Sequence, residues 1–145
     1  EGPSALVFFS STVAVGGPIG LTLADVELSA TTSCLYAPSI AGAGDVDGDG
    51  LGDLLLGCTD SDEAGSSAGK AYLVLGSTLA TSSSLTLDQD ADVAFVGEAA
   101  GSAGRSVAGA GVVDGDGLDD LLVGAPYFEG PTSYSGRAYL MLSPY

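Results

Sequence analysis

Histidine is absent from the 145-residue sequence, and only three residues carry a positive charge. Without histidine, the commonest general base and metal-binding imidazole is missing, so a Ser-His-Asp triad cannot form. The three basic residues oppose 19 acidic ones, and the resulting net charge of -16 repels phosphate groups. These absences argue against a conventional histidine-dependent hydrolase, and we expect no nucleic-acid partner.

Long apolar runs are also missing. The longest, residues 5–9, is far shorter than the roughly 18 residues that a membrane-spanning helix needs, and no charged segment precedes it to form a signal peptide. We therefore expect no membrane insertion. The length suits one domain, and the hydrophobic fraction of 46% is too high for a disordered chain. Because the sequence starts at Glu1 without methionine, we expect a piece of a longer polypeptide.

A repeat with an offset of 67 residues organises the chain. Residues 41–57 are nearly copied at 108–124, and residues 69–75 are nearly copied at 136–142. A third copy of the latter segment stands at residues 5–9. Such self-similarity is typical of repeat architectures, in which each unit buries its faces against its neighbours.

The short apolar segments, separated by glycine-rich turns, predict an all-β fold of four-stranded antiparallel sheets, about two per chain. The predicted strands are residues 39–44, 53–57, 70–75 and 91–96 in one unit, 106–111, 120–124 and 137–142 in the next, and 5–9 and about 21–28 near the start. By composition, residues 61–67 and 81–84 are predicted loops.

The first acidic loop has the spacing of a hard-cation site. Its candidate ligands at loop positions 1, 3, 5 and 9 are carboxylates and position 7 offers a backbone carbonyl: Asp45, Asp47, Asp49, Asp53 and Leu51. Ca²⁺ is the expected ion, because an all-protein oxygen cage suits it better than Mg²⁺. An EF-hand is excluded since Leu56 replaces the glutamate required at position 12. The alternative is a solvated Asp-Gly turn, but four carboxylates within nine residues repel one another strongly without a cation.

The second acidic loop departs from this pattern at its first position. Val112 stands there, while Asp114, Asp116, Asp120 and the Leu118 carbonyl remain as candidate ligands. Since affinity falls when ligand charge is removed, we predict a weaker or empty second site. We expect Asp119, at position 8, to point outward.

Both segments around these loops resemble the FG-GAP repeat, the blade motif of the integrin alpha-subunit propeller. Residues 124–126 are similar to the GAP element, whereas Gly57-Cys58-Thr59 is a degenerate copy; the FG element corresponds to residues 103–104 and 36–37. The resemblance implies β-propeller blades with a Ca²⁺ loop between the first and second strands. It also implies an extracellular or cell-surface location and roles in adhesion or ligand binding.

On this reading the chain is a single propeller unit, residues 1–145. The two repeats span approximately 33–98 and 100–145, and residues 1–30 supply strands of a neighbouring or shared blade. Two blades are too few for a stable monomer, because repeat proteins generally need about three units. We therefore expect a homo-oligomer that forms a closed propeller, or the remainder of a longer propeller chain.

Cys34 and Cys58 flank the first acidic loop, and the two strands that this loop joins bring both ends close together. A disulfide is therefore plausible, and an oxidising compartment favours it; the alternative is a pair of buried thiols. A second acidic group, Asp88, Asp90 and Asp92, lacks following glycines, and we interpret it as a solvated loop.

The favoured function is a non-catalytic calcium-binding module for adhesion, assembly or binding of a protein or glycan ligand. A carboxylate-dependent hydrolase is one alternative, but no carboxylate pair outside the acidic loops stands out. A soluble calcium-binding protein is another, and it would require the monomer to fold alone.

Overall fold

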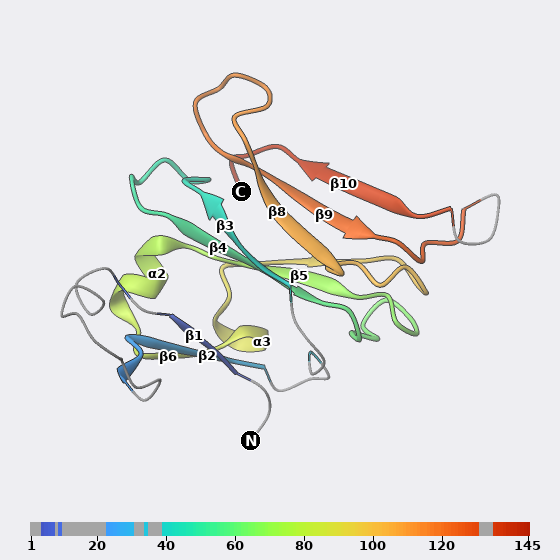
Figure 1. Ribbon diagram of the computed structural model, residues 1–145, viewed down its shortest axis with the longest axis horizontal. Coiled ribbons are helices and arrows are strands. Elements are labelled where there is room, and N and C mark those ends of the chain that lie inside the picture. The colour runs from blue at the N-terminus through green and yellow to red at the C-terminus, as the bar shows by residue number, and fades with distance from the viewer. Residues whose placement is uncertain (1–3, 8, 10–22, 31–33, 35–38, 131–134) are drawn as a thin grey trace, which may run out of the picture.

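A computed structural model describes residues 4–7, 9, 23–30, 34, 39–130 and 135–145. These residues form three small, mostly antiparallel sheets (Figure 1). The central sheet has the order β3-β4-β5-β7, with β3 (Ile40–Gly44), β4 (Asp53–Cys58), β5 (Lys70–Val74) and β7 (Val93–Val96). A second sheet has the order β10-β9-β8, with β8 (Ser106–Gly111), β9 (Asp120–Ala125) and β10 (Arg137–Met141).

The third sheet combines segments from the start and the middle of the chain. Its strands are β1 (Ser4–Val7), β2 (Val26–Ser29) and β6 (Ser84–Thr86). β1 and β2 are antiparallel, whereas β2 and β6 are parallel. The all-β class is confirmed, and the sheets are consistent with propeller-like blades.

The strands of both repeats lie within two residues of their predicted bounds. The strand predicted at about 21–28 is wrong at its start, because the structure describes residues 23–25 outside any strand and β2 begins at Val26. Residues 21–22, Phe8 and residues 36–37 of the FG element lie outside the described residues. The periodicity of the repeat therefore located most strands correctly.

Two short helices between β5 and β7 were not predicted. They are α2 (Gly76–Thr81) and α3 (Leu87–Asp90), and neither has a side-chain cap at its N-terminus. The predicted loop at 81–84 is wrong at both ends, because Thr81 ends α2 and Ser84 begins β6. Buried Leu79 and Leu87 hold these helices against the core, a tertiary contact that outweighs their weak local signal.

The two inner strands of the central sheet, β4 and β5, are buried on both faces. Leu56, Tyr72 and Val74 face a core cluster that includes residues of the third sheet and of α2. Leu55 and Leu73 alternate with them and face a second cluster, which the β8-β9-β10 sheet covers. Every residue of β5 is buried. The central sheet therefore depends on both neighbouring sheets for the burial of its inner strands.

A network of side-chain contacts at one end of the sheets links β10 to the segment that follows β7. Arg137 forms an ion pair with Glu98, and its guanidinium lies 3.6 Å from the centroid of the Phe128 ring. The Tyr139 hydroxyl donates to the same Glu98 carboxylate at 2.9 Å. These contacts join the two repeats at the end of the sheets opposite their acidic loops.

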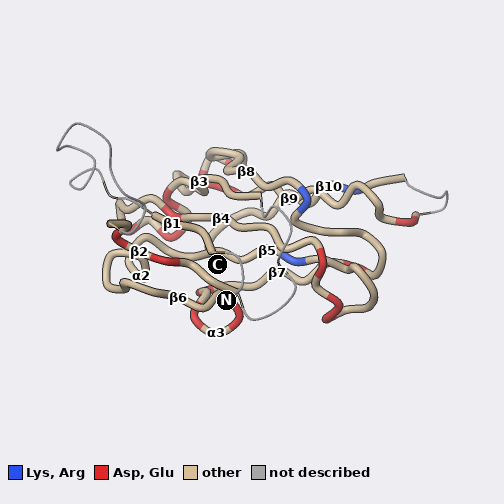
Figure 2. The backbone as a smooth tube through the Cα atoms, turned by 60° about the horizontal axis from the view of Figure 1, so that its bottom comes forward, with Lys and Arg blue, Asp and Glu red and all other residues tan. Residues whose placement is uncertain are grey.

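Charge is distributed unevenly over this framework. Acidic residues appear on the loops and around α3, whereas the basic ones occupy a few short stretches (Figure 2). Among the described residues, no helix is long and apolar enough to cross a bilayer.

Candidate metal centre

The first acidic loop follows a bulge at the end of β3, where the register against β4 shifts between Gly42 and Gly44. Its own carboxylates fold the loop. Asp45 accepts hydrogen bonds from the Gly48 and Gly50 amides at 2.8 and 3.0 Å. Asp47 and Asp49 accept the backbone amides two residues further on, at 3.1 and 2.7 Å. The backbone is thereby wrapped so that several acidic side chains approach one another.

Three of these side chains form a cluster. Asp45, Asp47 and Asp49 each offer one oxygen, and these oxygens lie within 4.8 Å of one another. Two Ca²⁺–oxygen bonds of roughly 2.4 Å span about 4.8 Å, so oxygens at this spacing can share one Ca²⁺ ion. Asp47 and Asp49 are exposed and Asp45 is half-buried. The oxygen donor set and its spacing fit a hard cation.

Asp53, the predicted ligand at position 9, lies outside this cluster. It is only 2% exposed, and its two oxygens accept the amides of Val46 at 2.8 Å and Gly76 at 2.7 Å. Burial raises the pKa of Asp53 above its usual value, against the effect of these two hydrogen bonds; the charges of Asp47 and Asp49 raise it further. Asp53 thus anchors the loop to the start of α2.

Leu51, predicted to offer its carbonyl, is exposed, and its amide donates to Asp49 at 2.7 Å. Of the five predicted positions, the structure therefore gathers the carboxylates of the first three.

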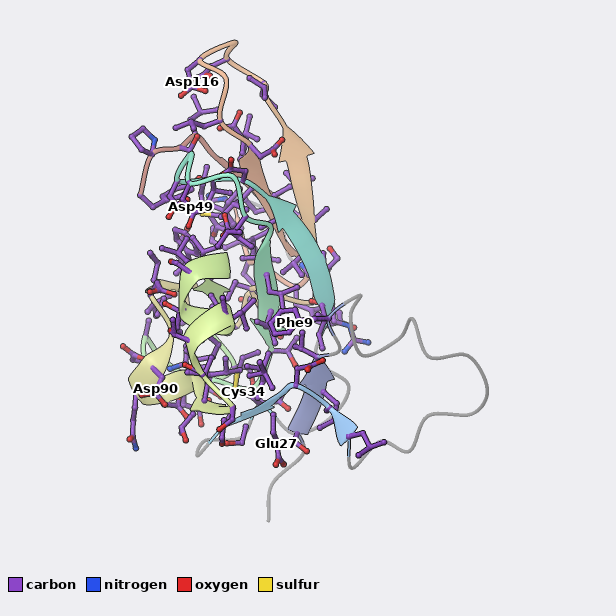
Figure 3. The ribbon with its side chains drawn as sticks, turned by 90° about the vertical axis from the view of Figure 1, so that its left-hand side faces the viewer. Phe9, Glu27, Cys34, Asp49, Asp90 and Asp116 are labelled. Atoms are coloured by element: carbon purple, nitrogen blue, oxygen red, sulfur yellow. A yellow bond between two sulfur atoms is a disulfide. The ribbon has the colours of Figure 1, made fainter. Side chains whose placement is uncertain are left out.

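The second acidic loop repeats the framework without the cluster. Asp114 and Asp116 accept backbone amides two residues further on, at 3.1 and 2.9 Å. In the second of these bonds the donor is the amide of Leu118. Among the described residues, only the first loop brings three carboxylates together. Figure 3 shows Asp49 and Asp116 on the two loops, toward the same end of the molecule.

Asp120 is the counterpart of Asp53 and is fully buried. Its oxygens accept the amides of Val113 at 2.7 Å and Ser143 at 2.9 Å. The hydrogen bond from the Ser143 amide holds the pKa of Asp120 below its usual value, despite the opposing effect of burial. The Ser143 hydroxyl adds a further contact at 3.4 Å.

Asp119 does not point outward, and that prediction is wrong. Its carboxylate Oδ2 accepts the Asp45 amide at 2.9 Å, and its own amide donates to the Asp45 carbonyl at 3.0 Å. The two acidic loops are therefore in direct contact. Only the packing of one repeat on the next reveals this, because the partners are far apart in the sequence.

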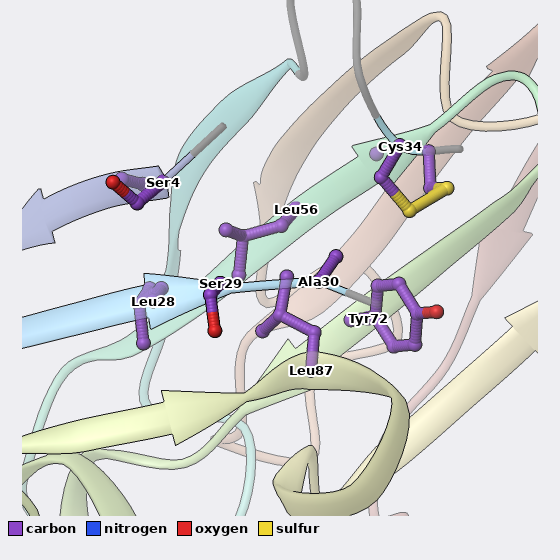
Figure 4. Close-up of a pocket in the computed structure, with 11 residues that line it drawn as sticks. Ser4, Leu28, Ser29, Ala30, Cys34, Leu56, Tyr72 and Leu87 are labelled. Atoms are coloured by element: carbon purple, nitrogen blue, oxygen red, sulfur yellow. A yellow bond between two sulfur atoms is a disulfide. The ribbon is translucent and has the colours of Figure 1, made fainter. Parts of the chain in front are cut away.

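The two cysteines form a disulfide, with their Cα atoms 4.6 Å apart. It borders a small cavity beneath β1 and β2 that Leu28, Leu56, Tyr72 and Leu87 also line (Figure 4). The cavity volume of about 20 Å³ holds little more than one water molecule. This space is too small for a substrate.

In the group Asp88, Asp90 and Asp92, the last two are exposed, as predicted, but the predicted loop is wrong for Asp88 and Asp90, which belong to α3. Asp92 accepts the Leu75 amide at 2.8 Å and the Thr78 hydroxyl at 2.9 Å. Asp90 accepts the Thr86 amide at 2.7 Å, and Asp88 accepts the Tyr72 hydroxyl. These hydrogen bonds tie α2, β6 and α3 to one another and to β5. The three carboxylates between β5 and β7 therefore have a structural role.

Lys70 completes this polar group. Its ammonium lies 2.9 Å from Glu63 and 3.5 Å from Asp88, and its side chain is 8% exposed. Although burial alone lowers the pKa of Lys70, its hydrogen bonds to Tyr72 and Glu63 raise that pKa above the ordinary value. These contacts favour the protonated form of Lys70 and join it to Glu63 and Asp88.

The mostly antiparallel sheets, with an acidic loop between the first and second strands of two of them, are consistent with a repeat protein of propeller-like blades. Comparison with family models gives the particular repeat: residues 103–141 match the FG-GAP repeat. The matched segment contains β8, the second acidic loop, β9 and β10. This match confirms the resemblance found in the sequence for the second repeat. FG-GAP repeats are a structural, non-enzymatic family. No curated protein matches the chain.

Proposed function

We propose that this chain is a non-catalytic, calcium-binding β-propeller module of the extracellular space or cell surface, acting in adhesion, ligand binding or assembly. The observation that carries the proposal is the cluster of Asp45, Asp47 and Asp49, with oxygens within 4.8 Å of one another. The FG-GAP match supports it, because such repeats often bind calcium and occur in extracellular domains.

The three clustered carboxylates would hold the ion, and Asp53 would fix the loop beneath them. Bound Ca²⁺ would neutralise the mutual repulsion of these carboxylates. Because the loop connects β3 to β4, binding free energy would stabilise the folded sheet. We expect a modest dissociation constant of roughly 10⁻⁴ to 10⁻³ M, typical of extracellular modules.

A carboxylate-dependent hydrolase is the less favoured alternative. The buried carboxylates Asp53 and Asp120 are already engaged by backbone amides, and Asp88, Asp90 and Asp92 hold neighbouring elements. A soluble calcium-binding protein is also less favoured, since the cation loop lies in a sheet that depends on neighbouring sheets for burial.

The edge of β10 supports an assembly role. Its counterpart β5 pairs with β7, whereas no described strand pairs with the outer edge of β10. An apolar groove of about 280 Å³ lies between β7 and the β9-β10 pair. It is lined by Phe95, Val96, Gly97, Ala103, Val123, Tyr139, Leu140 and Met141. We propose that a further strand completes this blade, supplied by a second copy of the chain or by the remainder of a longer propeller.

The disulfide supports the proposed location. Disulfides persist in oxidising compartments and are rare in the cytosol. The proposed partners are a protein or a glycan, and the net charge of -16 disfavours nucleic acid.

Calorimetric titration with CaCl₂ tests the metal site. We expect wild type to bind Ca²⁺, and Asp47→Asn to bind at least tenfold more weakly because one clustered charge is lost. The matched control is Asp114→Asn, which changes the equivalent position of the second loop and should leave Ca²⁺ binding at the first loop unchanged. Absence of binding by wild type would overturn the proposal.

Light scattering in millimolar Ca²⁺ tests assembly. A discrete multiple of the 14.1 kDa chain mass supports self-assembly into a closed propeller. A monomer that is well ordered in Ca²⁺ contradicts self-assembly and favours the longer propeller.

A further inference from the structure

Asp119 belongs to the second acidic loop, yet it holds the backbone of the first. Its Oδ2 accepts the Asp45 amide at 2.9 Å, and its amide donates to the Asp45 carbonyl at 3.0 Å. The peptide groups on both sides of the Asp45 Cα are therefore fixed by one residue of the other repeat.

The Asp45 carboxylate depends on this backbone position. Both of its oxygens accept amides within the loop, from Gly48 and Gly50, and it is the least exposed member of the carboxylate cluster. Asp45 also stands directly after β3, where the chain enters the loop. A shift of its backbone would move the carboxylate relative to Asp47 and Asp49.

The glycine before Asp45 leaves room for this contact. Gly44 has a φ of +86°, and a Cβ atom there would overlap the Asp119 carboxylate. The equivalent Gly111 has a similar φ of +71°, but a Cβ atom there would meet nothing within 4 Å. The space at Gly44 is therefore specifically occupied by Asp119.

The contact is not repeated by the first repeat toward another loop. The position equivalent to Asp119 in the first repeat is Gly52, which has no side chain to reach another loop. The sequence similarity of the two loops thus conceals a difference in how each contacts its neighbour.

We propose that Asp119 is a positioning residue for the first cation loop, acting through the Asp45 backbone. It makes Ca²⁺ binding by the first repeat depend on the docking of the second. This inference rests on the proposed function, since it concerns the same cation site. In this role Asp119 acts as a hydrogen-bond acceptor for the Asp45 amide, and the hydrogen bond matters more for Ca²⁺ affinity than the negative charge of Asp119.

Calorimetric titration of the full 145-residue chain with CaCl₂ tests the role of the carboxylate. Asp119→Ala removes the acceptor but keeps the Asp119 amide that donates to Asp45. We expect about tenfold weaker binding, equivalent to about 1.4 kcal/mol, because ion binding must then order a backbone that this hydrogen bond no longer fixes. Asp119→Asn keeps a carbonyl acceptor without the charge, and its affinity should stay within about threefold of wild type.

Thermal unfolding separates positioning from a merely structural role. Asp119→Ala should lower the unfolding midpoint more in 5 mM Ca²⁺ than in excess chelator, because weaker binding stabilises the fold less. Equal loss in both conditions would mean that the contact stabilises the interface without affecting the cation loop, contrary to the inference.

A glycine pair gives a second, independent test. Gly44→Ala and Gly111→Ala both place a Cβ atom at a positive φ, so their backbone strain is comparable. Only the first displaces the Asp119 carboxylate. We expect about tenfold weaker Ca²⁺ binding by Gly44→Ala and unchanged affinity in Gly111→Ala; equal affinities of the two variants contradict the inference.

The remaining outcomes separate this inference from the proposed function. If wild type binds no Ca²⁺, the proposed function fails and the inference fails with it. If wild type binds and Asp119→Ala binds equally well, the inference alone is wrong. If Asp119→Asn binds as weakly as Asp119→Ala, the charge of Asp119 is essential and the positioning role is wrong.

Discussion

The first acidic loop gathers Asp45, Asp47 and Asp49 into one cluster, whereas the second loop has Val112 in place of the first aspartate and extends Asp119 to its neighbour. Both loops nevertheless share the bulge at a glycine that precedes them, at Gly44 and at Gly111. The same backbone framework therefore supports a carboxylate cluster in one repeat and a contact between repeats in the other.

The part that the two loops share is the buried aspartate at position 9. Asp53 accepts the amides of Val46 and Gly76, and Asp120 accepts those of Val113 and Ser143. The donors are themselves equivalent, at the same offset of 67 residues. This aspartate is thus a structural anchor of the repeat, and the variation between repeats lies in the preceding positions.

The largest difference that we expect between the repeats concerns equivalent leucines of β4 and β9. Leu55 is completely buried, whereas Leu122 is 39% exposed because its sheet is covered on one face only. Leu55→Ala should lower the free energy of unfolding by about 2–5 kcal/mol, and Leu122→Ala by less than about 1 kcal/mol. Urea denaturation in chelator measures both. Equal losses would indicate that a partner in an assembly covers Leu122.

The next comparison uses the equivalent cations Lys70 and Arg137. Lys70 is buried and pairs with Glu63 and with the largely buried Asp88, so Lys70→Ala removes the cation that balances the Asp88 charge and should cost about 3 kcal/mol. Arg137 pairs with Glu98 at the surface, and Arg137→Ala should cost about 1 kcal/mol or less. Urea denaturation again measures the difference. A larger loss of stability for Arg137→Ala would contradict this ranking and show that the surface pair with Glu98 stabilises the fold more than the buried pairs of Lys70.

The smallest effect should come from restoring the missing aspartate of the second loop. Val112→Asp gives that loop the charge pattern of the first, and we expect a second, weak Ca²⁺ binding event by calorimetry. With a dissociation constant of roughly 1 mM, 5 mM Ca²⁺ would stabilise the variant by about 1 kcal/mol relative to chelator. A single binding event in Val112→Asp would show that contacts beyond ligand charge distinguish the two loops.

The sequence predicted the strands and the position of the acidic loops because both depend on local patterns. Short apolar segments bounded by glycine define the strands, and the spacing of Asp45, Asp47 and Asp49 alone places these side chains around one turn. Cys34 and Cys58, for which a disulfide and two free thiols both stayed open, are joined in the structure.

The contacts that sequence reasoning missed depend on tertiary packing. Asp119 meets Asp45 only when the repeats dock, and Asp88, Asp90 and Asp92 find donors on several elements. The helices α2 and α3 are too short for a periodic signal and owe their stability to buried leucines. Such features follow from neighbours in space, which a single sequence does not give.

The one-way contact from Asp119 to Asp45 gives the pair of repeats a fixed order. If the two repeats were exchanged in the chain, Gly52 would face the preceding loop and Asp119 would face away from it. The exchanged chain would keep every loop and strand but lose the contact between them. Two units of similar sequence are therefore not interchangeable, and their order carries structural information of its own.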